Sequence, residues 1–470
     1  MKKIQLDLKN RFLCFALFLA TITFVSCNKF LDEKGDSSLV IPNSLKDLQA
    51  LMDGFNTLNL GATPGLMEMN TDDFYVSGNV YNTFTEFEKE AYSFAAEPQF
   101  VQTNINLFWK NPYTVIFYAN VVLDRLQKVE NKDVPQYQSV KGQALFFRAY
   151  TFFQLAQVYC MAYKNGDENF NNTQLGLPLR LEPDFEGKSV RSTLGETYGQ
   201  ILKDLEAAVA LLPDAFEFTT RPSKAAALAL LARVNLSMED YEAALDHATA
   251  ALQLKSDLMD YKSRNENSTT PFEIMNPETI FSAYCTSLFN VLDPAKANVD
   301  KLLYRSYSDD DTRKALFFLV KTDGTISFKG NYAGWYNGSF FSGLAVDELY
   351  LIKAECQARL NQLEAAKLSM KTLLDKRYKT SYSFPEDVVS HDDVLAYILG
   401  ERRKELLFRG IRWTDIKRLN RDPRFAKDIV RKLEINGQEL TFVMPANSLK
   451  NAFLLPQDVI AVAEMQQNPR

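Results

Sequence analysis

Residues 223–254 read SKAAALALLARVNLSMEDYEAALDHATAALQL. Small side chains stand at three places in this segment, namely Ala232, Ala244 and Ala251. Their spacings of 12 and 7 residues are those at which the two helices of a tetratricopeptide repeat touch. The pattern recurs at an offset of 122 in residues 346–377, with Ala354, Ala366 and Leu373. Because each helical hairpin needs a neighbour to bury its remaining apolar face, we predict stacked helical repeats.

Apolar periodicity predicts further helices over residues 109–126, 143–161 and 194–212, the first two forming a more divergent repeat pair. The serine and aspartate of residues 44–47 form a capping box that begins another helix, which ends at Gly54. Strand-like alternation is scarce. We therefore predict a mostly α fold with long loops.

The two clear repeats are separated by a long segment of different texture, residues 256–344, which is rich in Asn, Asp, Tyr, Phe and Gly. An insertion of this length is usually functional or a subdomain. We predict an N-terminal helical region over residues 27–255, this loop-rich insertion as the ligand-binding part, and a C-terminal repeat and helices over residues 345–470.

Residues 1–26 differ from the rest of the chain. A positive start precedes an apolar run of 14 residues, Phe12–Val25, which is shorter than the ~18 residues of a membrane-spanning helix. Ser26 and Cys27 follow. This pattern predicts a bacterial lipoprotein signal peptide, with Cys27 acylated as the mature N-terminus. An ordinary export signal with an incidental cysteine is the alternative.

Composition excludes several functions. With 46% apolar residues among 470, the chain can bury a large core, and its net charge of −6 argues against nucleic-acid binding. The two histidines and five cysteines do not cluster at ligand spacing, so we expect no metal and no cofactor. Nucleophile-elbow, zinc-protease, phosphate-loop and dinucleotide motifs are absent, and we expect no catalytic residues. Glycan hydrolysis stays open, because it needs only two suitably spaced carboxylates.

Several ordered blocks resemble the SusD/RagB family of Bacteroidetes outer-membrane lipoproteins. They are Cys27–Asp32, the W-x3-Y-x2-I-x2-A-N helix from Trp109 to Asn120, Ala144–Tyr150, Arg191–Thr193, Ala225–Val234, Glu401–Arg418 and Gln467–Pro469. The resemblance implies a lipid-anchored (palmitate-bearing) protein on the cell surface at the outer membrane. It also implies capture of oligosaccharides or, in the RagB branch, peptides, and delivery to a SusC-like TonB-dependent transporter.

The most specific block has a structural interpretation of its own. Ser390 is suited to cap a helix that ends before Gly410, and Arg402, Glu405 and Arg409 fall within one apolar stripe of it. A lone buried ion costs several kcal/mol. We therefore predict an ion-pair network, with Trp413 packed beside it, that holds the last helices on the repeats.

Glycan platforms place aromatic rings beside short polar side chains, and two loop segments have this composition, residues 72–81 and 332–337. The predicted ligand-binding residues are Trp335, Tyr336, Tyr332, Asn337, Tyr75, Tyr81 and Asp73. A loop-stabilising cluster or a surface for the transporter are the alternatives. For Trp109, its helical position favours core packing.

We therefore predict a surface lipoprotein that binds a nutrient polymer or oligomer, most simply a glycan, and passes it to a transporter. One alternative is a tetratricopeptide scaffold that binds only the transporter proteins. RagB-like peptide binding is another.

Overall fold

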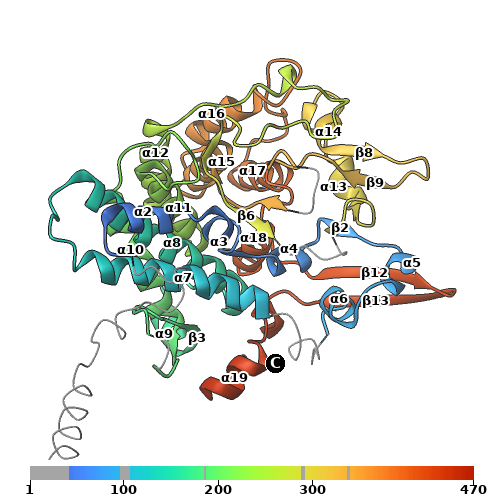
Figure 1. Ribbon diagram of the computed structural model, residues 1–470. Coiled ribbons are helices and arrows are strands. Elements are labelled where there is room, and N and C mark those ends of the chain that lie inside the picture. The colour runs from blue at the N-terminus through green and yellow to red at the C-terminus, as the bar shows by residue number, and fades with distance from the viewer. Residues whose placement is uncertain (1–41, 96–105, 185–186, 287–291, 336–338) are drawn as a thin grey trace, which may run out of the picture. The chain divides into compact units, whose positions relative to one another are not determined.

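The computed structural model describes residues 42–95, 106–184, 187–286, 292–335 and 339–470 (Figure 1). Residues Ser44–Arg470 form one compact unit. The boundaries at residues 255 and 344 stay a prediction, as do the signal peptide and the acylation of Cys27, which lie outside the described residues.

Both predicted repeats are helical hairpins, which confirms the mostly α fold. The first consists of α11 (Lys224–Ser237) and α12 (Tyr241–Leu254), and the second of α15 (Val346–Arg359) and α16 (Leu363–Leu374). All six pattern residues are fully buried. Helix α12 packs along α15, so the two repeats stack directly although the insertion separates them in sequence. The buried Arg233 joins them, donating to Glu348 at 2.8 and 2.6 Å.

Four earlier helices build the other half of the stack, each packed on the next along the chain (Figure 1). They are α2 (Leu45–Met52), α7 (Asn106–Leu126), α8 (Pro135–Tyr159) and α10 (Leu194–Leu211). The capping box of Ser44 is present as predicted. Helix α8 begins eight residues before the predicted residue 143, because Pro135 suits the first helical turn.

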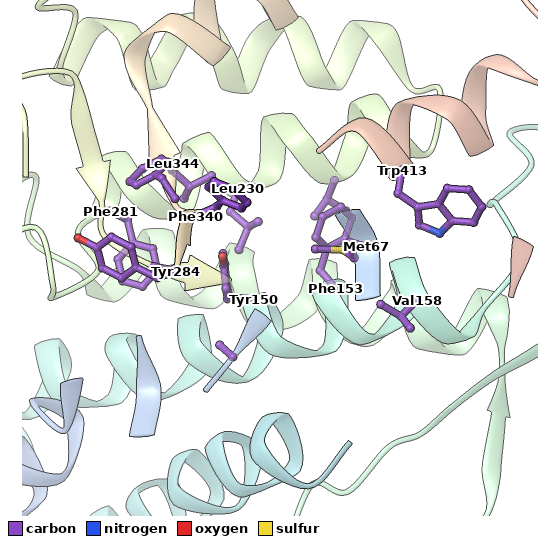
Figure 2. Close-up of a cluster of buried hydrophobic side chains, with 14 of the residues drawn as sticks. Met67, Tyr150, Phe153, Val158, Leu230, Phe281, Tyr284, Phe340, Leu344 and Trp413 are labelled. Atoms are coloured by element: carbon purple, nitrogen blue, oxygen red, sulfur yellow. The ribbon is translucent and has the colours of Figure 1, made fainter. Parts of the chain in front are cut away.

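Helix α8 lies at the centre of the fold, with every residue from Gly142 to Tyr159 buried. A helix that is buried on all sides shows little amphipathic periodicity. Figure 2 shows Tyr150 of this helix projecting toward Leu230 of α11, with Phe153 beside Met67. The phenol of Tyr150 donates to the backbone oxygen of Ser342 at 2.9 Å, and so ties α8 to the end of the insertion.

Residues 55–92 alternate short elements. They are α3 (Phe55–Leu58), β1 (Thr63–Pro64), α4 (Leu66–Met69), β2 (Phe74–Tyr75), α5 (Gly78–Asn82) and α6 (Glu86–Tyr92). Within this segment, residues 61–71 are all buried. It is therefore a core segment and not a surface loop.

Strands of the insertion pair with this segment. The insertion and its borders contain η2 (Tyr261–Ser263), β5 (Thr279–Phe281), β6 (Tyr284–Thr286), β7 (Asn298–Val299), α13 (Lys301–Arg305), α14 (Thr312–Phe317), β8 (Phe318–Val320), β9 (Ile326–Phe328), β10 (Phe340–Phe341) and β11 (Leu344–Ala345). β6 lies between β1 and β10, and β7 pairs with β2. These pairings fix the insertion on the N-terminal half. A smaller pair, β3 (Leu175–Pro178) and β4 (Arg191–Thr193), follows α9 (Glu168–Thr173).

The C-terminal part contains α17 (His391–Glu405), α18 (Arg412–Leu419), β12 (Ile429–Ile435), β13 (Gln438–Met444), η4 (Leu449–Asn451) and α19 (Gln457–Ala463). β12 and β13 form a long antiparallel hairpin that the sequence analysis did not predict. Its turn is Asn436–Gly437, and both residues have positive φ, 53° and 78°. This Asn-Gly pair suits a two-residue hairpin turn.

The ion-pair network predicted on α17 is confirmed. Glu405 accepts from Arg377 at 2.6 Å and from Arg313 at 2.8 Å, and both guanidinium groups are fully buried. Burial alone would raise the pKa of Glu405, but these two cations outweigh it and lower the pKa. Arg402 binds Asp415 at 2.9 Å, and Arg409 binds Asp347. Trp413 is fully buried, as predicted, and Ser390 caps α17.

Candidate functional site

The half-buried Trp335 forms an aromatic platform with Tyr284 of β6. Their ring centroids lie 4.4 Å apart with an interplanar angle of 29°, so the rings are stacked. Tyr284 is held in turn by Phe55 at 5.9 Å and by Phe341 at 6.2 Å, both edge-on. One face of the Trp335 indole is therefore covered by Tyr284, and its remaining accessible surface is presented on a rigid support.

Asn331 fixes the loop that carries Trp335. Its amide nitrogen donates to the backbone oxygens of Trp335 at 2.8 Å and Ser339 at 2.9 Å, which lie on either side of residues 336–338. Gly334 has φ of 76°, and a Cβ there would lie 2.5 Å from the nitrogen of Ile274. Only glycine fits this approach without strain. Asn331 and the close approach at Gly334 thus fix the backbone of the loop that carries the indole.

Two predicted ligand residues are buried, which corrects the sequence analysis. Tyr332 is 5% exposed; its hydroxyl donates to Glu278 at 2.7 Å, and the guanidinium of Arg409 lies 4.1 Å from its ring centroid. Asp73 is 1% exposed and accepts from Arg403 at 2.7 Å. Both side chains serve the buried network, because their loops turn inward at these positions.

Asp73 and its neighbour Asp72 are carboxylates whose charges are compensated by nearby arginines. Asp72 accepts from Arg412 at 2.7 and 3.0 Å. Burial alone would raise the pKa of Asp72, but Arg412 and Arg403 outweigh it and hold the pKa well below its usual range. The pKa of Asp73 is raised, mainly by burial. The pair binds the N-terminal segment to α17 and α18.

Tyr75 and Tyr81 are half-buried and stay predictions as ligand contacts. Tyr75 lies on β2, with the Lys301 ammonium 5.9 Å from its ring centroid. Tyr81 lies on α5 and stacks on Phe442 of β13 at 6.1 Å. Trp335 stacks on Tyr284, whereas Tyr75 lies beside Lys301 and Tyr81 stacks on Phe442. Tyr75 and Tyr81 therefore belong to other clusters than Trp335. Tyr336 and Asn337 lie outside the described residues.

The structure adds features that the sequence analysis missed. Tyr284 and Asn331 support Trp335, and no local pattern distinguishes them from other polar or aromatic residues.

A groove of about 920 Å³ runs along α7 beside Arg180 and Glu182. Four of its rings come from α7. Trp109, Tyr113 and Phe117 are spaced by four residues along one helix face, and Tyr118 is the fourth. Trp109 itself is buried against Tyr159 at 5.1 Å, in keeping with its predicted core position.

Across the described ranges, no three side chains of His, Cys, Asp or Glu gather as metal ligands would. Within the same residues, no helix has both the length and the apolar character that crossing a membrane requires.

Comparison with known proteins gives two family matches. Residues 29–236 match a family described as "Starch-binding associating with outer membrane", and residues 347–467 match one described as "SusD family". The unmatched segment between them contains the loop-rich insertion. A SusD-like protein P2 from Formosa agariphila is 30% identical over 144 residues, which is 31% of this chain and 26% of that relative. The chain therefore matches about a quarter of that relative's length.

Solved structures share the fold over nearly the whole chain. A SusD superfamily protein from Bacteroides thetaiotaomicron has a TM-score of 0.67 at 21% identity, with 91% of this chain and 100% of that one covered. A SusD superfamily protein from Bacteroides vulgatus has a TM-score of 0.71 at 21% identity, covering 91% and 99%. A SusD-like carbohydrate binding protein from the same species has a TM-score of 0.66 at 21% identity, covering 90% and 96%.

The stacked hairpins and the strands between them define a helical-repeat protein in which the segment between the two repeats packs on the N-terminal half. The chain belongs to the SusD/RagB family.

Proposed function

We propose that this protein captures a nutrient glycan on the surface around Trp335 and delivers it to a SusC-like TonB-dependent transporter at the outer membrane. The observation that carries the proposal is the Trp335 indole, stacked on Tyr284 and fixed by Asn331. A rigidly held ring that keeps part of its surface accessible suits the apolar C–H face of a pyranose. The description of the first matching family, which names starch and the outer membrane, supports the same ligand class and location.

The proposed activity is binding and not catalysis. A platform of this kind recognises a sugar by ring contact and by nearby amides, and it needs no group that transfers a proton. A second candidate function, a scaffold that binds only the transporter, is favoured by the stacked repeats, because helical-repeat surfaces commonly bind proteins.

Replacing Trp335 by alanine is expected to weaken glycan binding about 10- to 100-fold, because an aromatic contact at a binding surface is worth roughly 1–3 kcal/mol. The measurement is affinity electrophoresis against plant, host and microbial polysaccharides, followed by calorimetry with the glycan that binds. Leu368→Ala is the control, since Leu368 is 67% exposed and lies on α16, which supplies no residue of the platform.

Equal loss in the two variants, or undiminished binding by Trp335→Ala, would exclude the platform as the site. Binding of mixed peptides alone would assign the protein to peptide capture. Retention of the transporter complex by a variant that no longer binds glycan would separate capture from the scaffold function.

The proposed anchor is tested at Cys27. Cys27→Ser is expected to abolish incorporation of labelled palmitate and to move the protein from the membrane fraction to the soluble exported fraction, because the thiol is the proposed site of acylation. Co-purification of a TonB-dependent transporter with the wild-type protein tests the partner. Unchanged labelling in Cys27→Ser would show that the anchor lies elsewhere.

A further inference from the structure

A second pocket lies away from the residues of the Trp335 platform. It measures about 600 Å³, which is within the range of small-molecule sites. Its walls come from the segment after α8, from α9, from α18 and from η4, and it shares no lining residue with the platform.

Lys417 forms the buried part of this pocket. It is 2% exposed, and its Nζ donates to the backbone oxygens of Gln157 at 2.9 Å and Cys160 at 2.6 Å. An ammonium group has three protons to donate, so one is left for another acceptor. In the described part of the chain no carboxylate forms an ion pair with Lys417, and burial lowers its pKa to about 8. The backbone carbonyls at the end of α8 are its only compensation among the described residues.

Two further cations line the pocket. Arg421 pairs with Glu239 at 2.9 Å and donates to the backbone oxygen of Tyr163. Lys164 lies 3.7 Å from Asp167 and 3.8 Å from the ring centroid of Phe170. Among the lining residues Asp167 is the one carboxylate, against three cations. Asp167 and Glu239 face the other two cations, so Lys417 is the lining cation without a carboxylate partner among the described residues, and its charge attracts an anion.

Asn451 supplies an acceptor on another wall. It is 3% exposed, and its buried Oδ1 has no hydrogen-bond partner among the described residues. Buried polar atoms in proteins nearly always form a hydrogen bond, so we expect a donor from a bound ligand at this oxygen. A ligand that satisfies both Lys417 and Asn451 must bring an anionic acceptor and a hydrogen-bond donor into one small volume.

We propose that this pocket binds the acidic unit of a sugar, a hexuronate, with its carboxylate on Lys417 and a hydroxyl donating to Asn451. A hexuronate carries both groups on one ring, whereas a neutral hexose lacks the charge and a simple carboxylate lacks the hydroxyl. This site is separate from the platform, and the inference does not rest on the proposed function of Trp335.

The test uses the exported chain carrying Cys27→Ser and titrates it by calorimetry with D-galacturonate and D-glucuronate, and with D-galactose and D-glucose as neutral partners. We expect at least tenfold tighter binding of one acid than of its neutral partner. Lys417→Met should abolish that preference, whereas Lys432→Met, which removes an exposed lysine of β12, should keep it. Tenfold tighter binding of digalacturonate than of the monosaccharide would show that the ligand is a unit of an oligomer. Equal affinity would show that the ligand is the free sugar acid.

Removing Lys417 takes a buried charge without a carboxylate partner out of the interior, so the variant is expected to fold, which circular dichroism and thermal unfolding check. Should it fail to fold, Asn451→Asp provides the second variant, because a carboxylate at this position repels the ligand and should weaken acid binding at least tenfold while leaving neutral sugars unaffected. Equal binding of acids and neutral sugars, no acid binding at 10 mM, or an unchanged preference in the folded variants would overturn the inference. An acetylated dipeptide with a free carboxylate that competes as well as the sugar acid would also overturn it.

Discussion

Arg377→Met is expected to lower the free energy of unfolding by about 3–5 kcal/mol, because breaking a buried ion pair leaves charges without compensation. Arg377 is fully buried and donates to Glu405 at 2.6 Å, to Glu278 at 2.8 Å and to the backbone oxygen of Met259 at 2.8 Å. The variant keeps most of the volume of the side chain but leaves two carboxylates and a carbonyl without this donor. Urea unfolding at pH 7 measures the difference.

The adjacent Lys376 provides the matched control. Its side chain is partly exposed and lies 3.7 Å from Asp260. An exposed pair of this kind contributes about 0–1 kcal/mol, so Lys376→Met should change stability little. Part of the loss in Arg377→Met should return at pH 5, where protonation relieves the stranded carboxylates. A loss below 1 kcal/mol in Arg377→Met would contradict the view that this network holds the C-terminal helices.

Glu68→Gln is expected to remove a pH dependence of stability. Glu68 is fully buried; one oxygen accepts the backbone N–H of Gly410, and the other has no partner among the described residues. Burial, with a smaller contribution from Asp73, raises its pKa from 4.5 to about 8. Between these values the folded protein holds a proton that the unfolded chain has released. The contribution of Glu68 to stability is therefore full below the lower value and is lost as the pH rises toward the upper one.

The size of this effect follows from the linkage relation. One pKa unit corresponds to about 1.4 kcal/mol, so wild type should lose about 3 kcal/mol relative to Glu68→Gln between pH 5.5 and pH 8.5. Taking the difference between the two proteins cancels the other titrating groups. Denaturant unfolding at the two pH values measures it, and the exposed Glu86→Gln serves as the control. A difference that does not change with pH would show that Glu68 is ionised in the folded protein throughout.

Most of the helical fold follows from local sequence patterns. The alanine spacing of the repeats and the serine caps predicted α11, α12, α15, α16 and α17, because helix packing and capping depend on residues a few positions apart. The charges on α17 predicted the network because ions on an apolar face need partners. The partners Arg313 and Arg377 come from distant segments, and no spacing in the chain indicated them.

The hairpin of β12 and β13 was missed for a physical reason. Its inward positions include Arg431, which is buried over the rings of Tyr92 at 4.3 Å and Phe94 at 4.5 Å. An arginine at an inward position breaks the apolar alternation by which a strand is predicted. The Asn436–Gly437 turn was the available signal.

The aromatic loops mark the limit of prediction. Composition indicated which segments carry rings and short polar side chains. It does not indicate which way a side chain faces, because periodicity gives that direction only in a helix or a strand. In the loops, the direction of each ring is set by contacts with segments far along the chain. Tyr332 turns inward because Glu278 and Arg409 bind it, whereas Trp335, three residues later, rests on Tyr284 and keeps part of its surface accessible.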